Sequence, residues 1–130
     1  MRALKIAVIG SRIRSGGGIN HALALLQPES LEARVPTDIT VFASEELKEA
    51  LGKSSRISIE SAPTFGLGVL GSALWELFVL PRLAATRGFE ILLYLDAGSL
   101  VMSDRSIVVC QDMLPFEPGE RQRYSYFSLE

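Results

Sequence analysis

The chain passes from a short apolar run through three consecutive glycines, Gly16–Gly18, into an apolar helical pattern, and this transition constrains the fold most. Ile6–Ile9 is short and rich in β-branched residues, which favours a buried strand over a helix. Beyond the glycines, apolar residues recur at the spacing of one helix face: Ile19, Ala22, Leu23 and Leu26. The chain therefore opens with a strand, a glycine loop and a helix.

The glycine spacing fits neither of two familiar phosphate-binding motifs. The dinucleotide-binding fingerprint requires a third glycine at the position that His21 occupies. The Walker loop requires a lysine and then a serine or threonine where Ile19 and Asn20 stand. Neither motif identifies a ligand here.

A more general property of the loop remains. The first backbone N–H groups of a helix have no partner within the helix, so those of Gly17, Gly18 and Ile19 can hold a phosphate or carboxylate. Arg12 and Arg14 lie close by in sequence. The alternative is that the glycines only permit a sharp bend and close helix packing.

Composition limits the classes of protein. A length of 130 residues predicts one domain, and 48% hydrophobic with 22% charged residues predicts a globular chain. The net charge of −2 argues against a general nucleic-acid binder. Cys110, the only cysteine, has no partner for an internal disulfide and is expected to be a buried, inert thiol. No cleavable signal peptide is visible, which predicts a cytoplasmic location.

The most apolar stretch is Leu67–Leu80. It contains Glu76 and stops at Pro81, short of the roughly 20 residues that a membrane span needs. We therefore expect a core-facing helix, with contact to a membrane surface as the alternative.

Apolar runs alternate with helical patterns along the chain, which predicts parallel strands joined by crossover helices. The expected strands are Leu4–Ile9, Asp38–Phe42, Arg56–Ile59, Glu90–Leu95 and Ser106–Cys110. The expected helices are Gly18–Gln27, Glu45–Leu51 and Val69–Arg87, the last kinked or divided at Pro81. The predicted fold is α/β, a Rossmann-like doubly wound parallel sheet of strand order 3-2-1-4-5.

In such a sheet, ligands bind beyond the carboxyl ends of the strands, where the strand order reverses. Asp96 and Asp112 follow the fourth and fifth strands directly, so each can accept a hydrogen bond from a substrate or shape its own turn. The helical angle predicts that His21, the only histidine, faces away from the core. No second His or Cys stands at ligand spacing, so no metal site is expected.

The segment Ile107–Tyr124 resembles part of the group 1, family-four glycosyltransferases of the GT-B fold. The opening strand, glycine loop and helix over Lys5–Leu26 are similar to that family as well. So are Leu80–Leu83 and Phe89–Leu95, which match the approach to its fourth strand.

The resemblance implies the acceptor-side, N-terminal half of a retaining glycosyltransferase without a metal or other cofactor. A nucleotide-sugar is its co-substrate and a sugar or lipid its acceptor. In this family Gly16, Gly17 and Gly18 would approach the donor diphosphate, with Asn20 or His21 assisting. Gln111 stands where many members carry a histidine near the reacting sugar, and Asp112 matches a position that is often Asp or Asn.

The family continues beyond this point with a donor-binding domain. We therefore expect residues 1–128 to form an incomplete acceptor-side domain and Leu129-Glu130 to derive from cloning. Such a piece is expected to be inactive alone, to dimerise through its truncated end, and to work in the cytoplasm or at the inner face of a membrane. A free-standing small-anion or nucleotide-binding module is the alternative. A receiver-like signalling domain fits less well, because Gly10-Ser11 replace the acidic pair expected after its first strand.

Overall fold

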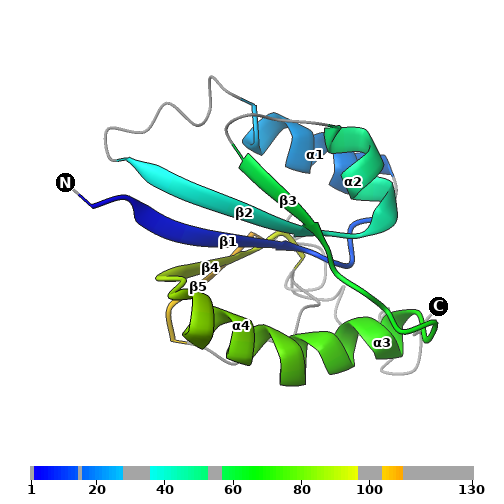
Figure 1. Cartoon of the computed structure of the whole chain (residues 1–130). Coiled ribbons are helices and arrows are strands. Elements are labelled where there is room, and N and C mark those ends of the chain that lie inside the picture. Colours follow the sequence, from blue (N-terminus) through cyan, green and yellow to red (C-terminus); the bar gives the residue numbers. More distant parts are fainter. Residues whose placement is uncertain (1, 15, 28–35, 53–56, 97–103, 110–130) are drawn as a thin grey trace, which may run out of the picture.

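The computed structural model describes residues 2–14, 16–27, 36–52, 57–96 and 104–109. Within them, five parallel strands form one sheet in the order β3-β2-β1-β4-β5 (Figure 1). The strands are β1 (Leu4–Gly10), β2 (Thr37–Ala43), β3 (Ile57–Ser61), β4 (Ile91–Tyr94) and β5 (Ser106–Val108). The predicted fold class and strand order are confirmed.

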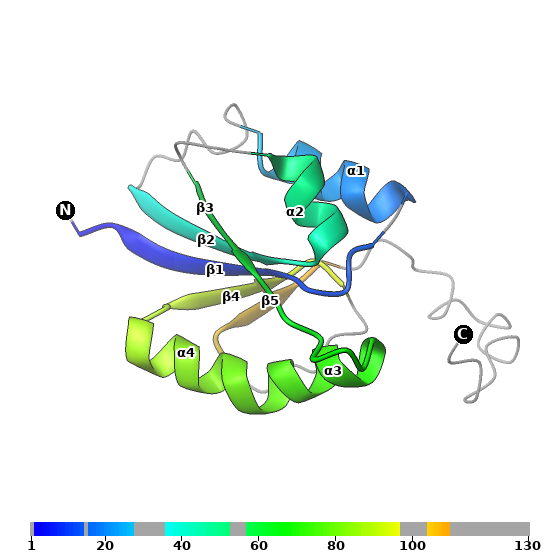
Figure 2. The same ribbon diagram turned by 45° about the vertical axis from the view of Figure 1, so that its right-hand side comes forward.

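Helices cover both faces of the sheet. The helices α1 (Gly16–Leu25) and α2 (Glu45–Leu51) lie on one face. The other face is covered by α3 (Val69–Leu74), a π-helical turn η1 (Trp75–Val79) and α4 (Leu80–Arg87), which run on from one another (Figure 2). The bounds of α2 are those predicted, whereas α1 begins and ends two residues earlier than expected.

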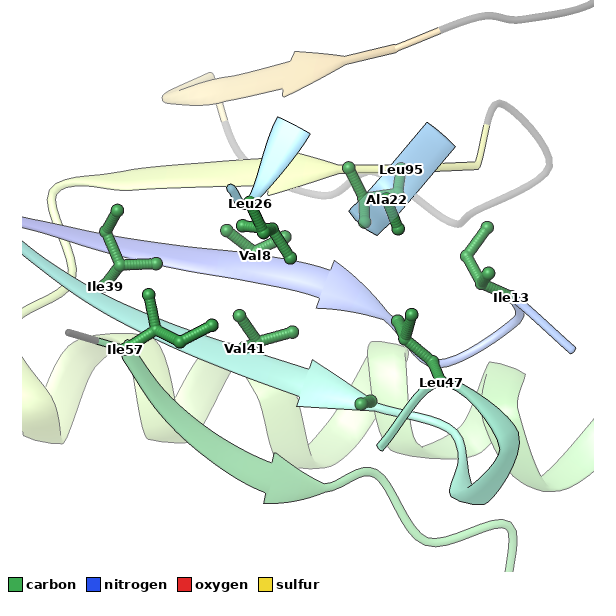
Figure 3. Close-up of a cluster of buried hydrophobic side chains, with 10 residues drawn as sticks. Val8, Ile13, Ala22, Leu26, Ile39, Val41, Leu47, Ile57 and Leu95 are labelled. Atoms are coloured by element: carbon green, nitrogen blue, oxygen red, sulfur yellow. The ribbon is translucent and has the colours of Figure 1, made fainter. Parts of the chain in front are cut away.

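Each face of the sheet has its own apolar core, because alternate residues of a strand point to opposite faces. Val8 of β1 and Val41 of β2 pack under α1 and α2 with Ala22, Leu26 and Leu47 (Figure 3). On the other face the core contains Ala7, Ile9, Phe42, Trp75, Leu80 and Tyr94. All five strands being parallel, both faces need this cover.

The third predicted helix changes its hydrogen-bonding pattern just before Pro81. The N–H of Leu80 donates to the carbonyl of Trp75, five residues back, which defines the π turn. Pro81 then stands in the first turn of α4 and, having no N–H, donates no hydrogen bond to the turn before it. The helix is therefore not divided at Pro81: the change in hydrogen bonding takes the form of a π turn within a continuous helical run.

The prediction that Leu67–Leu80 faces the core is wrong for part of that stretch. Trp75 and Leu80 are buried, but Val69, Leu70 and Phe78 are each more than half exposed, at 60 to 62%. Only one side of a helix can pack against the sheet. A helix that is apolar on all sides therefore leaves its other apolar side chains exposed.

Several predictions fall outside the described residues. They concern Cys110, Gln111, Asp112, the family-like segment that follows Val109, and the suggestion about Leu129-Glu130.

Candidate functional site

The carboxyl edge of the sheet between β1 and β4 is the candidate site. These strands are neighbours, yet the chain leaves β1 toward β2 and leaves β4 toward β5. A doubly wound sheet opens a crevice at such a reversal of strand order. The loop after β1, the start of α1 and Asp96 after β4 all border this edge.

The loop after β1 is held from the side of α2. The N–H of Ile13 donates to the carbonyl of Gly10 over 3.2 Å, which closes a turn. The Ser44 hydroxyl donates to the Ile13 carbonyl and accepts the N–H of Leu47, 3.2 Å away, as the N-cap of α2. The buried side chain of Ile13 adds to the core under α1. The loop is therefore fixed by both packing and hydrogen bonds.

The same loop is held from the other face by Glu76 of η1. The Ser11 hydroxyl and Arg12 Nε donate to Glu76 Oε1 over 3.0 and 3.1 Å, and Arg12 Nη2 donates to Oε2 over 3.0 Å. The Glu76 side chain is fully buried, and that of Arg12 is 18% exposed. Such a two-point guanidinium–carboxylate pair fixes direction as well as distance.

Tyr94, at the end of β4, lies in the field of this carboxylate. Burial raises the pKa of the Tyr94 phenol, and the negative charge of Glu76 raises it further. The phenol therefore stays protonated at neutral pH. Tyr94 is buried in the core beneath the candidate site rather than displayed in it.

Gly16–Gly18 form the first turn of α1, called here the α1 tip. Gly16 has φ of +53°, a conformation that disfavours any residue with a side chain. A Cβ atom placed on Gly16 or Gly17 would meet no other atom within 4 Å, so the space above the tip is open. Gly18 differs, because a Cβ there would lie 3.4 Å from Ile13. The tip thus offers backbone N–H groups to the surroundings at the carboxyl edge of the sheet.

Two other predicted site residues are described by the structure. Asn20 is exposed on α1, and Asp96 is half-buried, two residues after the end of β4. Gln111 and Asp112, expected after the fifth strand, lie outside the part of the chain that the structure describes.

His21, expected to face away from the core, is half-buried on α1, and its Nε2 atom is shielded without a hydrogen-bond partner. A shielded nitrogen without a partner costs free energy, so His21 is a less accessible ligand than the tip beside it.

Glu76 is the residue that sequence reasoning missed. Its signal was present, because Glu76 is the only acid in the apolar stretch Leu67–Leu80. A carboxylate buried with such neighbours needs a cation. Arg12, expected near the anion site, is that cation, which leaves Arg14 as the exposed arginine of the loop.

A second hollow lies at the opposite, amino end of the strands. It has a volume of about 260 Å³ and is lined by Lys5, Asp38, Thr40, Thr86, Arg87 and Phe89. The described residues contain no group of three or more His, Cys, Asp or Glu side chains that could hold a metal ion. No protein-family model, curated protein or solved structure matches the chain.

Proposed function

We propose that this chain forms the acceptor-side half of a retaining glycosyltransferase of the GT-B kind and that its α1 tip contacts the diphosphate of a nucleotide-sugar. The observation that carries the proposal is the open tip at the carboxyl edge, beside the reversal of strand order. The resemblance over the opening segment supplies the reaction class.

The chemistry assigned to the tip needs only backbone groups. When the bond from the sugar to the diphosphate breaks, negative charge builds on the departing oxygen. Amide N–H groups already aimed at that oxygen, together with the positive end of the α1 dipole, stabilise the charge. Glu76, Arg12 and Ser44 hold the preceding loop, so the amides do not have to be ordered when the ligand arrives.

Gln111 and Asp112 keep the roles that the resemblance implies. Gln111 would hydrogen-bond a sugar hydroxyl, since an amide is not a proton acceptor in the ordinary sense. Asp112 would bind substrate or shape its loop. Transfer itself requires the donor-binding half, so this chain alone is expected to bind weakly and not to turn over.

Calorimetric titration of the chain with nucleoside diphosphates and nucleotide-sugars tests the proposal. A half-site should bind with a Kd of about 1 mM, because only part of the ligand is contacted. Gly17→Val should abolish that binding by filling the space above the tip, while the fold persists because nothing stands within 4 Å of the new Cβ. Ala24→Val, at an exposed position on the same helix, is the matched control and should bind normally.

Two results would count against the assignment. Equal binding by the Gly17→Val variant would remove the α1 tip from the site. Binding at about 1 µM or tighter by this chain alone would favour the free-standing module over half of a two-lobed enzyme.

A further inference from the structure

The hollow at the amino end of the strands lies at the end of the sheet opposite the α1 tip. Its volume is about 260 Å³, and its lining combines side chains of β1, β2 and the end of α4: Lys5, Asp38, Thr40, Thr86, Arg87 and Phe89. It therefore opens on the face of the sheet that α4 covers (Figure 1). A ligand bound there would not meet the diphosphate proposed at the tip.

The alternation of side chains along β1 and β2 makes this end of the sheet polar. Residues two apart on a strand point to the same face. On β2, Phe42 belongs to the core beneath α4, whereas Thr40 and Asp38 lie nearer the amino end and line the hollow. Lys5 is the register partner of Asp38 on β1 and points to the same face. The apolar core therefore gives way to polar side chains where α4 ends.

Arg87 forms a wall of the hollow and has its charge already paired. Its guanidinium donates to both oxygens of Glu60 over 2.8 and 2.7 Å and lies 5.4 Å from the centre of the Phe89 ring. The neighbouring Thr86 hydroxyl donates to the carbonyl of Arg82 over 2.7 Å, so toward a ligand its oxygen can only accept. Among the residues that line the hollow, Lys5 therefore carries the positive charge that a ligand can use.

Lys5 and Asp38 bring opposite charges into the hollow without neutralising each other. They face each other on neighbouring strands, yet in the part of the chain that the structure describes they form no ion pair with each other. Lys5 Nζ donates instead to the carbonyl of Arg87 over 3.2 Å. An ammonium group has three N–H donors, so two remain for a ligand, and the Asp38 carboxylate accepts hydrogen bonds. The hollow thus presents a cation and an anion side by side.

We propose that this hollow binds a small zwitterion of the α-amino acid class. The carboxylate of the ligand accepts hydrogen bonds from the Lys5 ammonium, and its ammonium donates to the Asp38 carboxylate. The Thr86 oxygen supplies a second acceptor for the ligand ammonium. Each charge of the ligand meets its opposite, and binding leaves the net charge of the hollow unchanged.

Other classes of ligand fit this lining less well. A phosphate or nucleotide would find one usable cation and would be repelled by Asp38. An apolar molecule would cover Lys5 and Asp38 without pairing them, which costs free energy. The volume of about 260 Å³ is below the roughly 300–1,000 Å³ of sites for drug-sized ligands, which favours a compact ligand.

Two-dimensional ¹H–¹⁵N NMR of the whole chain during titration with L-serine at neutral pH tests this proposal. The amide signals of Lys5, Asp38 and Thr86 should shift with a Kd of about 1 mM, because so small a ligand makes few contacts. Acetate and methylammonium each carry one of the two charges and should bind at least about tenfold more weakly than L-serine.

Two variants assign the charges to their residues. Lys5→Gln and Asp38→Asn should each raise the Kd for L-serine about tenfold, since each removes one charge-assisted contact. Both side chains are exposed near the start of a strand, so the fold is kept. Lys48→Gln removes an exposed lysine of α2, over the opposite face of the sheet, and should bind like the parent chain.

Three results would overturn the proposal. Acetate binding as tightly as L-serine would show a simple anion site. Equal binding of L-serine by the parent chain and both variants would place the ligand elsewhere. No shift around the hollow at about 50 mM L-serine would exclude binding there at the expected strength. None of these measurements uses a nucleotide-sugar, so a failure here leaves the proposed glycosyl transfer untouched.

Discussion

At the scale of single residues, Glu76 supports the candidate site by holding the loop after β1 in place, although it does not face a ligand. A buried carboxylate is costly unless it is paired and hydrogen-bonded, and Glu76 meets both conditions through Arg12 and Ser11. These hydrogen bonds join the turn η1 to the loop that leads to the α1 tip. The pair therefore couples the stability of the fold to the position of the tip.

Replacing Glu76 by glutamine should lower the free energy of unfolding by about 3 kcal/mol. The substitution keeps the size of the side chain but leaves the Arg12 guanidinium largely buried without its counter-charge. Urea denaturation at neutral pH measures the change. Glu49→Gln, an exposed acid replaced on α2, should stay within about 0.5 kcal/mol of the parent chain. Similar values for the two variants would show that the pair does little for stability.

Residue-scale prediction from sequence succeeded where local chemistry decides. Ser44 stands directly before Glu45 and Glu46, a pattern typical of a helix N-cap, and the structure shows that cap at the start of α2. The ion pair of Arg12 with Glu76 and the shielding of His21 Nε2 depend instead on side chains that the fold places beside these residues. Those contacts span 64 residues for Arg12, and no local pattern encodes them.

At the scale of elements, one ion pair joins β3 to the end of α4. Arg87 donates to both oxygens of Glu60, over 2.8 and 2.7 Å, and its guanidinium lies over the rings of Phe42 and Phe89. The hydrogen bonds from Arg87 hold the pKa of the Glu60 carboxyl below its ordinary value, against the opposing effect of burial. The contact is partly exposed, so its contribution to stability is below about 1 kcal/mol.

This pair should make the unfolding free energy depend on pH in acid. The Glu60 pKa is lower in the folded chain than in the unfolded one, so its stabilisation is present above the ordinary value of 4.5. It is lost as the pH falls through the lower, folded pKa. Between about pH 6 and about pH 3, the parent chain should lose more stability than Glu60→Gln in chemical denaturation. Glu46→Gln on α2 should follow the parent chain, and parallel curves for all three would contradict the assignment.

Element types were predictable because their periodicity is local. The β-branched runs gave all five strands, and helical spacing gave the helices to within two residues. The outward side of α3 and η1 was not predictable in the same way. The sequence alone does not show whether an apolar residue on a helix packs against the sheet or lies on another side of the helix. For Leu67–Leu80 we had expected the whole stretch to pack against the sheet.

At the scale of the whole molecule, the order of strands followed from the alternation of strands and helices, because parallel connections are right-handed and short. That order also selects the edge at which a ligand can bind. It does not identify the ligand, since many functions use this architecture. The reaction class comes from the resemblance, and part of the segment that carries it, including Gln111 and Asp112, lies outside the described residues.

The amides of the α1 tip are proposed to meet an anionic ligand at the carboxyl edge of the sheet, and two-dimensional ¹H–¹⁵N NMR during titration with a nucleoside diphosphate measures this contact residue by residue. We expect the amide signals of Gly17, Gly18 and Ile19 to shift in proportion to bound ligand, while those of Lys5, Asp38 and Thr86 around the opposite hollow stay in place. Shifts confined to the opposite hollow, or none at the tip, would contradict it.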